Sequence, residues 1–169
     1  LLKNIMGLWI LQECKRQWEK EGKEYSFSQL CEIAMEAKPF QCLINPDDAL
    51  FMPPFGMVDR IKSYCQNTGQ YVPQTDGEVV RCIFESLALT YKKAITRLES
   101  ILGYPLPVLH IVGGGSQNTT LCQFTANAIA KPVVAGPVEA TAIGNIVCQL
   151  IALGEIKDLS QARQIIAES

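Results

Sequence analysis

The segment from Val108 to Asn118 constrains the fold of this chain more strongly than any other part of the sequence. Its first part, residues 108–112, is a largely apolar run rich in β-branched side chains and predicts a buried strand. Three glycines, Gly113–Gly115, follow at once, and the pattern over residues 119–130 predicts a helix. A strand, a glycine turn and a helix bring backbone close to a ligand and direct helix N–H groups toward it. The sequence therefore predicts an α/β fold with a nucleotide-contacting turn.

Two common glycine motifs for nucleotide binding do not match this segment. A P-loop requires the pattern GxxxxGK[ST], which does not occur in the chain. A dinucleotide-binding turn requires GxGxxG and an acidic residue about 20 positions later for the ribose. Here Asn118 occupies the sixth position, and the next predicted strand ends at Ala135 without an acid. The sequence thus argues against an NAD-dependent oxidoreductase.

The rest of the chain is predicted to be mainly helical. Two capping boxes, Ser26 with Gln29 and Thr75 with Glu78, mark helix starts, and Gly103 marks the end of the helix that Thr75 begins. Prolines make the segment 40–56 irregular. The predicted helices cover residues 1–20, 26–37, 58–66, 75–102, 119–130 and 138–153 and a short segment from residue 158, and the strands cover residues 108–112 and 132–135.

Charge and hydropathy exclude several classes of partner. The 15 Lys and Arg residues nearly balance the 17 Asp and Glu residues, so the sequence predicts neither a nucleic-acid surface nor a polybasic membrane patch. No apolar run approaches the length of about 18 residues that suggests a membrane span. The chain begins at Leu1 rather than at Met, and we expect it to be a piece of a longer protein.

The cysteines are predicted to be buried, reduced thiols of a cytoplasmic protein. None belongs to a CxxC pair and the chain has a single histidine, so the sequence predicts no metal site. An odd number of cysteines at mostly apolar helical positions favours free thiols in a reducing compartment. A Cys65–Cys82 bridge between adjacent elements is the alternative. The cysteines stand at positions 14, 31, 42, 65, 82, 122 and 148.

Four runs in order along the chain resemble the C-terminal domain of the FGGY family of carbohydrate kinases. They are LKNIMGLW at 2–9, RCIFESLAL at 81–89, LHIVGGG at 109–115 and AGPVEA at 135–140. The triple glycine alone is a weak signal, whereas the four runs together are specific. The resemblance implies an α/β ATPase domain of the actin, Hsp70 and hexokinase-like (ribonuclease H-like) superfamily, with a mixed sheet and flanking helices.

The resemblance also implies an activity for the whole protein. The family transfers a phosphoryl group from ATP, with Mg²⁺, to a sugar hydroxyl, and this chain is most similar to members that act on L-rhamnulose and form L-rhamnulose 1-phosphate. Fuculose, xylulose or glycerol kinases, and a non-catalytic nucleotide-binding module, are the alternatives. The catalytic Asp and the first phosphate loop of the family lie upstream of this chain, so we expect the fragment to be inactive alone. The sequence does not predict an oligomeric state.

Several residues of the glycine turn receive a role from the resemblance. Gly114 would lie against the nucleotide, and Gly113 and Gly115 would shape the turn. Ser116 and Asn118, with Gln117 between them, either contact the ribose or phosphates or only cap the following helix. His110, inside the predicted strand, is expected to be structural.

Two residues of the first predicted helix also match functional positions of the family. Gln12 matches a nucleotide contact and Asn4 a residue that reaches the sugar. If one helix carries both, they share a side and lie roughly 12 Å apart at about 1.5 Å per residue. The alternative for both is a solvated position at the rim of an amphipathic helix.

Overall fold

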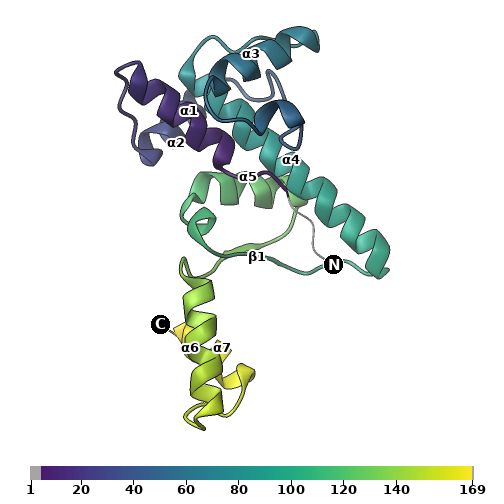
Figure 1. Ribbon diagram of the computed structural model, residues 1–169. Coiled ribbons are helices and arrows are strands. Elements are labelled where there is room, and N and C mark those ends of the chain that lie inside the picture. The colour runs from purple at the N-terminus through teal and green to yellow at the C-terminus, as the bar shows by residue number, and fades with distance from the viewer. Residues whose placement is uncertain (1–4, 169) are drawn as a thin grey trace. The chain divides into compact units, whose positions relative to one another are not determined.

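The structure is a computed structural model that describes residues 5–168, in which the chain forms two compact units. The first unit comprises residues 5–109 and 118–133, and the second comprises residues 110–117 and 134–168. Within residues 5–168, no helix has both the length and the apolar character needed to cross a bilayer. The first unit contains α1 (Trp9–Lys20), α2 (Phe27–Glu36), the 3-10 helix η1 (Ala49–Phe51), α3 (Met57–Asn67), α4 (Asp76–Leu102) and α5 (Thr119–Ile129) (Figure 1).

Two short strands, β1 (Leu109–Ile111) and β2 (Val133–Ala135), form a parallel sheet through which the unit boundary runs. The Leu109 N–H donates to the Pro132 carbonyl and the Gly136 N–H donates to the Ile111 carbonyl, so both strands advance in the same direction. Among the described residues the sheet consists of these two strands. The chain is therefore α/β and rich in helix, and a larger mixed sheet stays a prediction for the whole protein.

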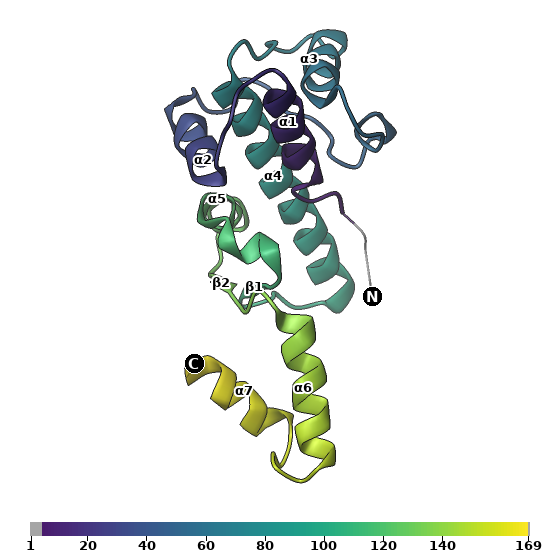
Figure 2. The ribbon, with the colours of Figure 1, turned by 60° about the vertical axis from the view of Figure 1, so that its left-hand side comes forward.

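The core of the first unit is built around α4. Its segment from Val79 to Ala88 carries a nearly continuous run of buried side chains, apart from half-buried Arg81. Helices α1, α2 and α5 lie alongside α4 (Figures 1 and 2), and α3 packs against α1. Beyond this segment α4 is more exposed, and the apolar side chain of Leu102 at its end is exposed. The buried side chains that complete the core include Ile10, Leu11, Cys14, Trp18, Leu30, Ala34, Phe51, Met57, Ile61 and Leu121.

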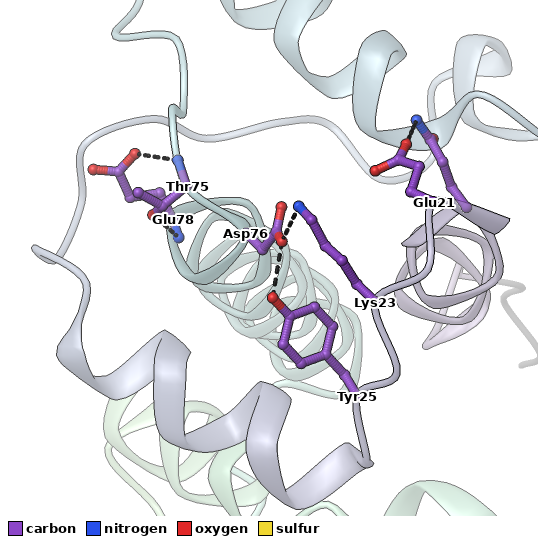
Figure 3. A network of polar contacts seen from close by, with 7 residues as sticks. Glu21, Lys23, Tyr25, Thr75, Asp76 and Glu78 are labelled. Carbon is purple, nitrogen blue, oxygen red and sulfur yellow. Dashed lines mark hydrogen bonds and ion pairs between the residues drawn. The ribbon is translucent and has the colours of Figure 1, made fainter. Parts of the chain in front are cut away.

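The start of α4 is held by the capping box that the sequence predicted. The Glu78 N–H donates to the Thr75 hydroxyl at 3.2 Å, and the Thr75 N–H donates to the Glu78 carboxylate at 3.1 Å. Beside this box, Asp76 accepts from Lys23 at 2.7 Å and from the Tyr25 hydroxyl at 3.0 Å (Figure 3). The hydrogen bond from Lys23 to Asp76 raises the pKa of that lysine. The segment before α2 is thereby tied to the first turn of α4.

A second polar cluster joins α4 to its two neighbouring helices. Arg81 donates to the buried carboxylate of Glu85 at 2.7 Å and to the Ala34 carbonyl in α2 at 3.2 Å. Its guanidinium also lies over the ring of Phe124 in α5, at 4.9 Å from the centroid. Glu85 in turn accepts from the Phe40 N–H at 2.8 Å. One charged pair thus positions α5, the helix that follows the glycine segment.

The closest approach of α2 to α4 occurs at Gly77. A Cβ atom on Gly77 would overlap the Ile33 carbonyl group, which belongs to backbone and is not free to move aside. We expect Gly77→Ala to lower the free energy of unfolding by about 1–3 kcal/mol through overpacking, even though alanine favours helix by about 1 kcal/mol over glycine. Urea denaturation followed through the fluorescence of buried Trp18 measures this change.

The matched control for this prediction is Gly144→Ala in the helix α6. Nothing lies within 4 Å of a Cβ placed on Gly144, and its φ is not positive. This variant should gain about 0.5–1 kcal/mol from backbone entropy and helix propensity. If Gly77→Ala were as stable as Gly144→Ala, α2 and α4 would not be in the contact described.

The first helix begins later than the sequence predicted. The sequence predicted a helix over residues 1–20, but residues 5–8 are not helical and α1 starts at Trp9. The Met6 N–H donates instead to the carboxylate of Asp47 at 2.9 Å, which satisfies it outside a helix. Gly7, a poor helix former, lies within the same stretch.

The second unit has a small core of its own. It contains the 3-10 helix η2 (Gly114–Gln117), α6 (Ala140–Ala152) and α7 (Leu159–Glu168). Val147, Ile156 and Ala162 are buried together between α6 and α7. Asp158 caps α7 by accepting from the N–H groups of Ser160 and Gln161 at 2.9 and 3.0 Å. Both predicted helices are therefore present.

Candidate nucleotide-binding turn

The glycine turn leaves β1 through a backbone conformation that favours glycine. Gly113 has a φ of +80°, in the left-handed region. Its N–H donates to the Pro137 carbonyl at 3.0 Å, and its carbonyl accepts from the Ser116 N–H at 3.0 Å. The chain then enters η2. The backbone of this turn is therefore held at both ends by hydrogen bonds within the second unit.

A second glycine brings the segment after β2 against the end of β1. The Gly136 N–H donates to the Ile111 carbonyl at 2.8 Å. A Cβ on Gly136 would lie 2.9 Å from Cγ1 of Val112, closer than real contacts allow. This close packing joins Gly136 to a segment more than twenty positions earlier in the chain, so no local sequence pattern reveals it.

Gly114 and Gly115 differ from Gly113 and Gly136 in having no structural requirement for glycine. Neither has a positive φ, and no atom lies within 4 Å of a Cβ placed on either residue. Gly114 is exposed and Gly115 is half-buried. Neither backbone strain nor packing inside the described chain explains why these positions lack side chains. Open space beside exposed backbone is the geometry that a bound ligand needs.

Two of the polar residues after the glycines, Ser116 and Asn118, have structural partners. The Ser116 hydroxyl donates to the Gly113 carbonyl at 2.8 Å, and Ser116 is buried. Asn118 is the N-cap of α5, where its side-chain oxygen accepts from the Leu121 N–H at 2.8 Å. The capping role of Asn118 is therefore confirmed. A nucleotide contact by Ser116, Gln117 or Asn118 stays a prediction.

The other predicted positions lie on different elements. Gln12 is exposed on α1. Asn4 lies outside the described residues, and the continuous helix that would have joined it to Gln12 is absent over residues 5–8. His110 is exposed in β1, so the prediction that it is buried was wrong. The reason is that the described part of the sheet has only two strands, which leaves alternate side chains uncovered.

Comparison with known proteins assigns this combination of helices, strand pair and glycine turn to a family. The family model described as the C-terminal domain of the FGGY family of carbohydrate kinases matches residues 1–153. The chain belongs to this family.

Individual relatives in this family show a more specific similarity, to proteins named rhamnulokinase. The chain is 48% identical over 169 residues to the rhamnulokinase of Bacteroides thetaiotaomicron, with 100% of the chain and 34% of that protein aligned. It is 46% identical over 168 residues to the rhamnulokinase of Bacillus subtilis, with 99% of the chain and 34% of that protein aligned. It is 43% identical over 168 residues to the rhamnulokinase of Oceanobacillus iheyensis, with 99% of the chain and 35% of that protein aligned. The chain thus spans 34–35% of the length of these relatives.

Proposed function

We propose that this chain is the nucleotide-binding part of a two-domain, ATP-dependent sugar kinase that converts L-rhamnulose to L-rhamnulose 1-phosphate. The observation that carries this proposal is the likeness of the whole chain, at 41–48% identity, to proteins named rhamnulokinase. The α/β character of the chain supports placing it in the actin, Hsp70 and hexokinase-like superfamily. In this proposal the chain contributes to the ATP site of the C-terminal domain.

The glycine turn is the part of the chain that we assign to ATP. The open space at Gly114 and Gly115 supports this assignment, because a side chain there would compete with a ligand rather than with the protein. The hydrogen bonds and close packing of Gly113 and Gly136 hold the backbone of the turn around this open space. When ATP is bound it supplies the phosphoryl group, and this turn would bind and orient the nucleotide.

Among the described residues, no group of three or more carboxylate or imidazole side chains converges to form an all-protein site for the Mg²⁺ ion that phosphoryl transfer requires. Mg²⁺ takes hard oxygen ligands. Among residues 5–168, the group of side chains with metal-ligand spacing consists of three cysteines, which are soft ligands. We therefore assign the Mg²⁺ ligands to the phosphates and to other parts of the protein. The catalytic base, which is an Asp in this family, is likewise assigned to another part of the full-length protein.

Gln12 and Asn4 are two further positions that we assign to ligands. The exposure of Gln12 on α1 is compatible with a nucleotide contact. Asn4 is proposed to contact the sugar on the likeness of residues 2–9 to the family alone. In the full-length protein, Gln12→Ala should raise the KM for ATP more than the KM for the sugar, and Asn4→Ala should do the reverse. If either variant changed the two KM values in the opposite order, the ligand contact proposed for that residue would be wrong.

The activity is tested by an ADP-release assay on the full-length protein with Mg-ATP. The acceptors compared are L-rhamnulose, L-fuculose, D-xylulose and glycerol. We expect L-rhamnulose to give the highest kcat/KM, because the likeness to rhamnulokinases covers the chain from end to end. Preference for another acceptor would keep the kinase and discard the rhamnulose assignment. Binding of ATP without turnover of any acceptor would instead indicate a non-catalytic nucleotide-binding module.

A further inference from the structure

The segment before α1, residues 5–8, is not helical and is attached to the first unit in two ways. The side chains of Met6 and Leu8 pack against the core of this unit. The Met6 N–H donates to a carboxylate oxygen of Asp47 at 2.9 Å. Asp47 lies 41 positions later in the chain, in the turn between α2 and η1. Its side chain thus fixes backbone that leads into α1 from a distant part of the sequence.

The turn that carries Asp47 is held by hydrogen bonds of its own. The Asp48 N–H donates to the Asn45 carbonyl at 3.0 Å, and the Asp47 N–H donates to the side-chain oxygen of Asn45 at 3.3 Å. Just before the turn, the Ile44 N–H donates to the Ser86 hydroxyl of α4 at 2.9 Å. The carboxylate of Asp47 is therefore presented to residues 5–8 from a turn anchored on the central helix.

We propose that Asp47 is a positioning residue for the acceptor sugar, because its hold on the backbone of Met6 sets where Asn4 meets that sugar. The inference rests on the proposed function, in which Asn4 contacts the sugar. Asn4 is joined to Met6 through one intervening residue, so the reach of its side chain depends on where Met6 is fixed. Gln12 depends less on this bond, since it lies on α1, whose inner face is buried in the core. Asp47 therefore acts on the sugar rather than on the nucleotide.

A carboxylate suits this role. Charged acceptors bind backbone N–H groups more strongly than neutral ones. Asp47 itself is exposed, so the bond is expected to contribute more to the placement of residues 5–8 than to the stability of the whole unit. Precise placement matters for a transfer reaction, because a small displacement of a bound reactant lowers the rate. Asp47 touches neither reactant in this proposal and acts only through Met6.

Initial rates of the full-length protein with Mg-ATP and L-rhamnulose test the proposal. Asp47→Ala removes the acceptor and should raise the KM for L-rhamnulose about 5- to 10-fold, while the KM for ATP changes less than about twofold. Asp47→Asn keeps a side-chain oxygen for the Met6 N–H and should leave the KM for L-rhamnulose within about twofold of the unmodified protein. An equal rise of both KM values in Asp47→Ala, or an asparagine variant as impaired as the alanine variant, would overturn the proposal.

Asp48→Ala is the matched control. Asp48 is the neighbouring carboxylate of the same turn, and it accepts from the Leu50 N–H at 2.9 Å as the cap of η1. Its replacement should lower the melting temperature and leave both KM values unchanged. If Asp48→Ala raised the KM for L-rhamnulose as much as Asp47→Ala, loosening of the whole turn would explain the effect and the proposal would be wrong.

Hydrogen–deuterium exchange of the same full-length proteins gives a readout that needs no turnover. A peptide covering residues 5–8 should exchange at least about fivefold faster in Asp47→Ala, because the Met6 N–H loses its acceptor. Unchanged exchange there would overturn the proposal even in an enzyme that phosphorylates L-rhamnulose. Absence of turnover by the unmodified protein with every acceptor would instead reject the proposed function, and with it the role of Asp47 toward the sugar. The two failures are thereby distinguished.

Discussion

Replacing Gly114 with valine is expected to weaken ADP binding by the full-length protein about 10- to 100-fold while leaving its melting temperature nearly unchanged. The two halves of this expectation rest on different observations. A Cβ on Gly114 meets no atom of the described chain, and its backbone is not in the left-handed region, so folding tolerates a side chain there. The same side chain would enter the space that we assign to the nucleotide.

Isothermal titration calorimetry with ADP and a thermal melt on the same preparation measure the two effects. Gly144→Val is the matched control, since Gly144 is also exposed, also lacks neighbours around a Cβ and lies in the same unit on α6. It should leave the ADP affinity unchanged. Unchanged ADP affinity in Gly114→Val would remove the glycine turn from the nucleotide site, independently of which sugar the enzyme uses.

A comparison within the same triplet separates binding from folding. Gly113→Val places a β-branched side chain at a φ of +80° and should destabilise the protein by about 1–3 kcal/mol through backbone strain. Gly114→Val should show the opposite profile, with affinity lost and stability kept. If both variants lost stability equally, Gly114 would have a structural role that the described contacts do not explain.

Removing Arg81 is expected to produce the largest loss of stability, about 3–5 kcal/mol for Arg81→Ala. This change leaves the carboxylate of Glu85, which is 3% exposed, without its cationic partner. It also removes the hydrogen bond to the Ala34 carbonyl and the contact with the ring of Phe124. Three helices thus lose a shared attachment at once. Urea denaturation of the protein measures the loss.

Two further variants establish that the loss comes from the buried charge. Arg97→Ala, at an exposed position of the same helix, should change stability by less than about 0.5 kcal/mol. The double variant Arg81→Met with Glu85→Leu should recover part of the lost stability, because an apolar pair no longer buries an unpaired charge. A loss below about 1 kcal/mol in Arg81→Ala would show that Glu85 is adequately solvated without the arginine.

The amino-acid sequence alone determined those features of this protein that depend on neighbouring residues. Both capping boxes are present as predicted, because a side chain and a backbone N–H three positions apart satisfy each other locally. Gly103 ends α4 with a φ of +77°, at the position where the sequence predicted the end of this helix. The order of strand, glycine turn and helix around Gly113 is likewise local. The family likeness rests on runs of this kind.

Only the tertiary structure decided the features that depend on segments distant in the chain. Helix α1 starts at Trp9 because Met6 finds a partner in Asp47, and no local pattern reveals that partner. The attachment of α2 and α5 to Arg81, and the meeting of Cys42 with two helical cysteines, have the same origin. Periodicity tells which side chains are buried, but it does not tell which of them meet. That is set by the packing of whole helices against one another.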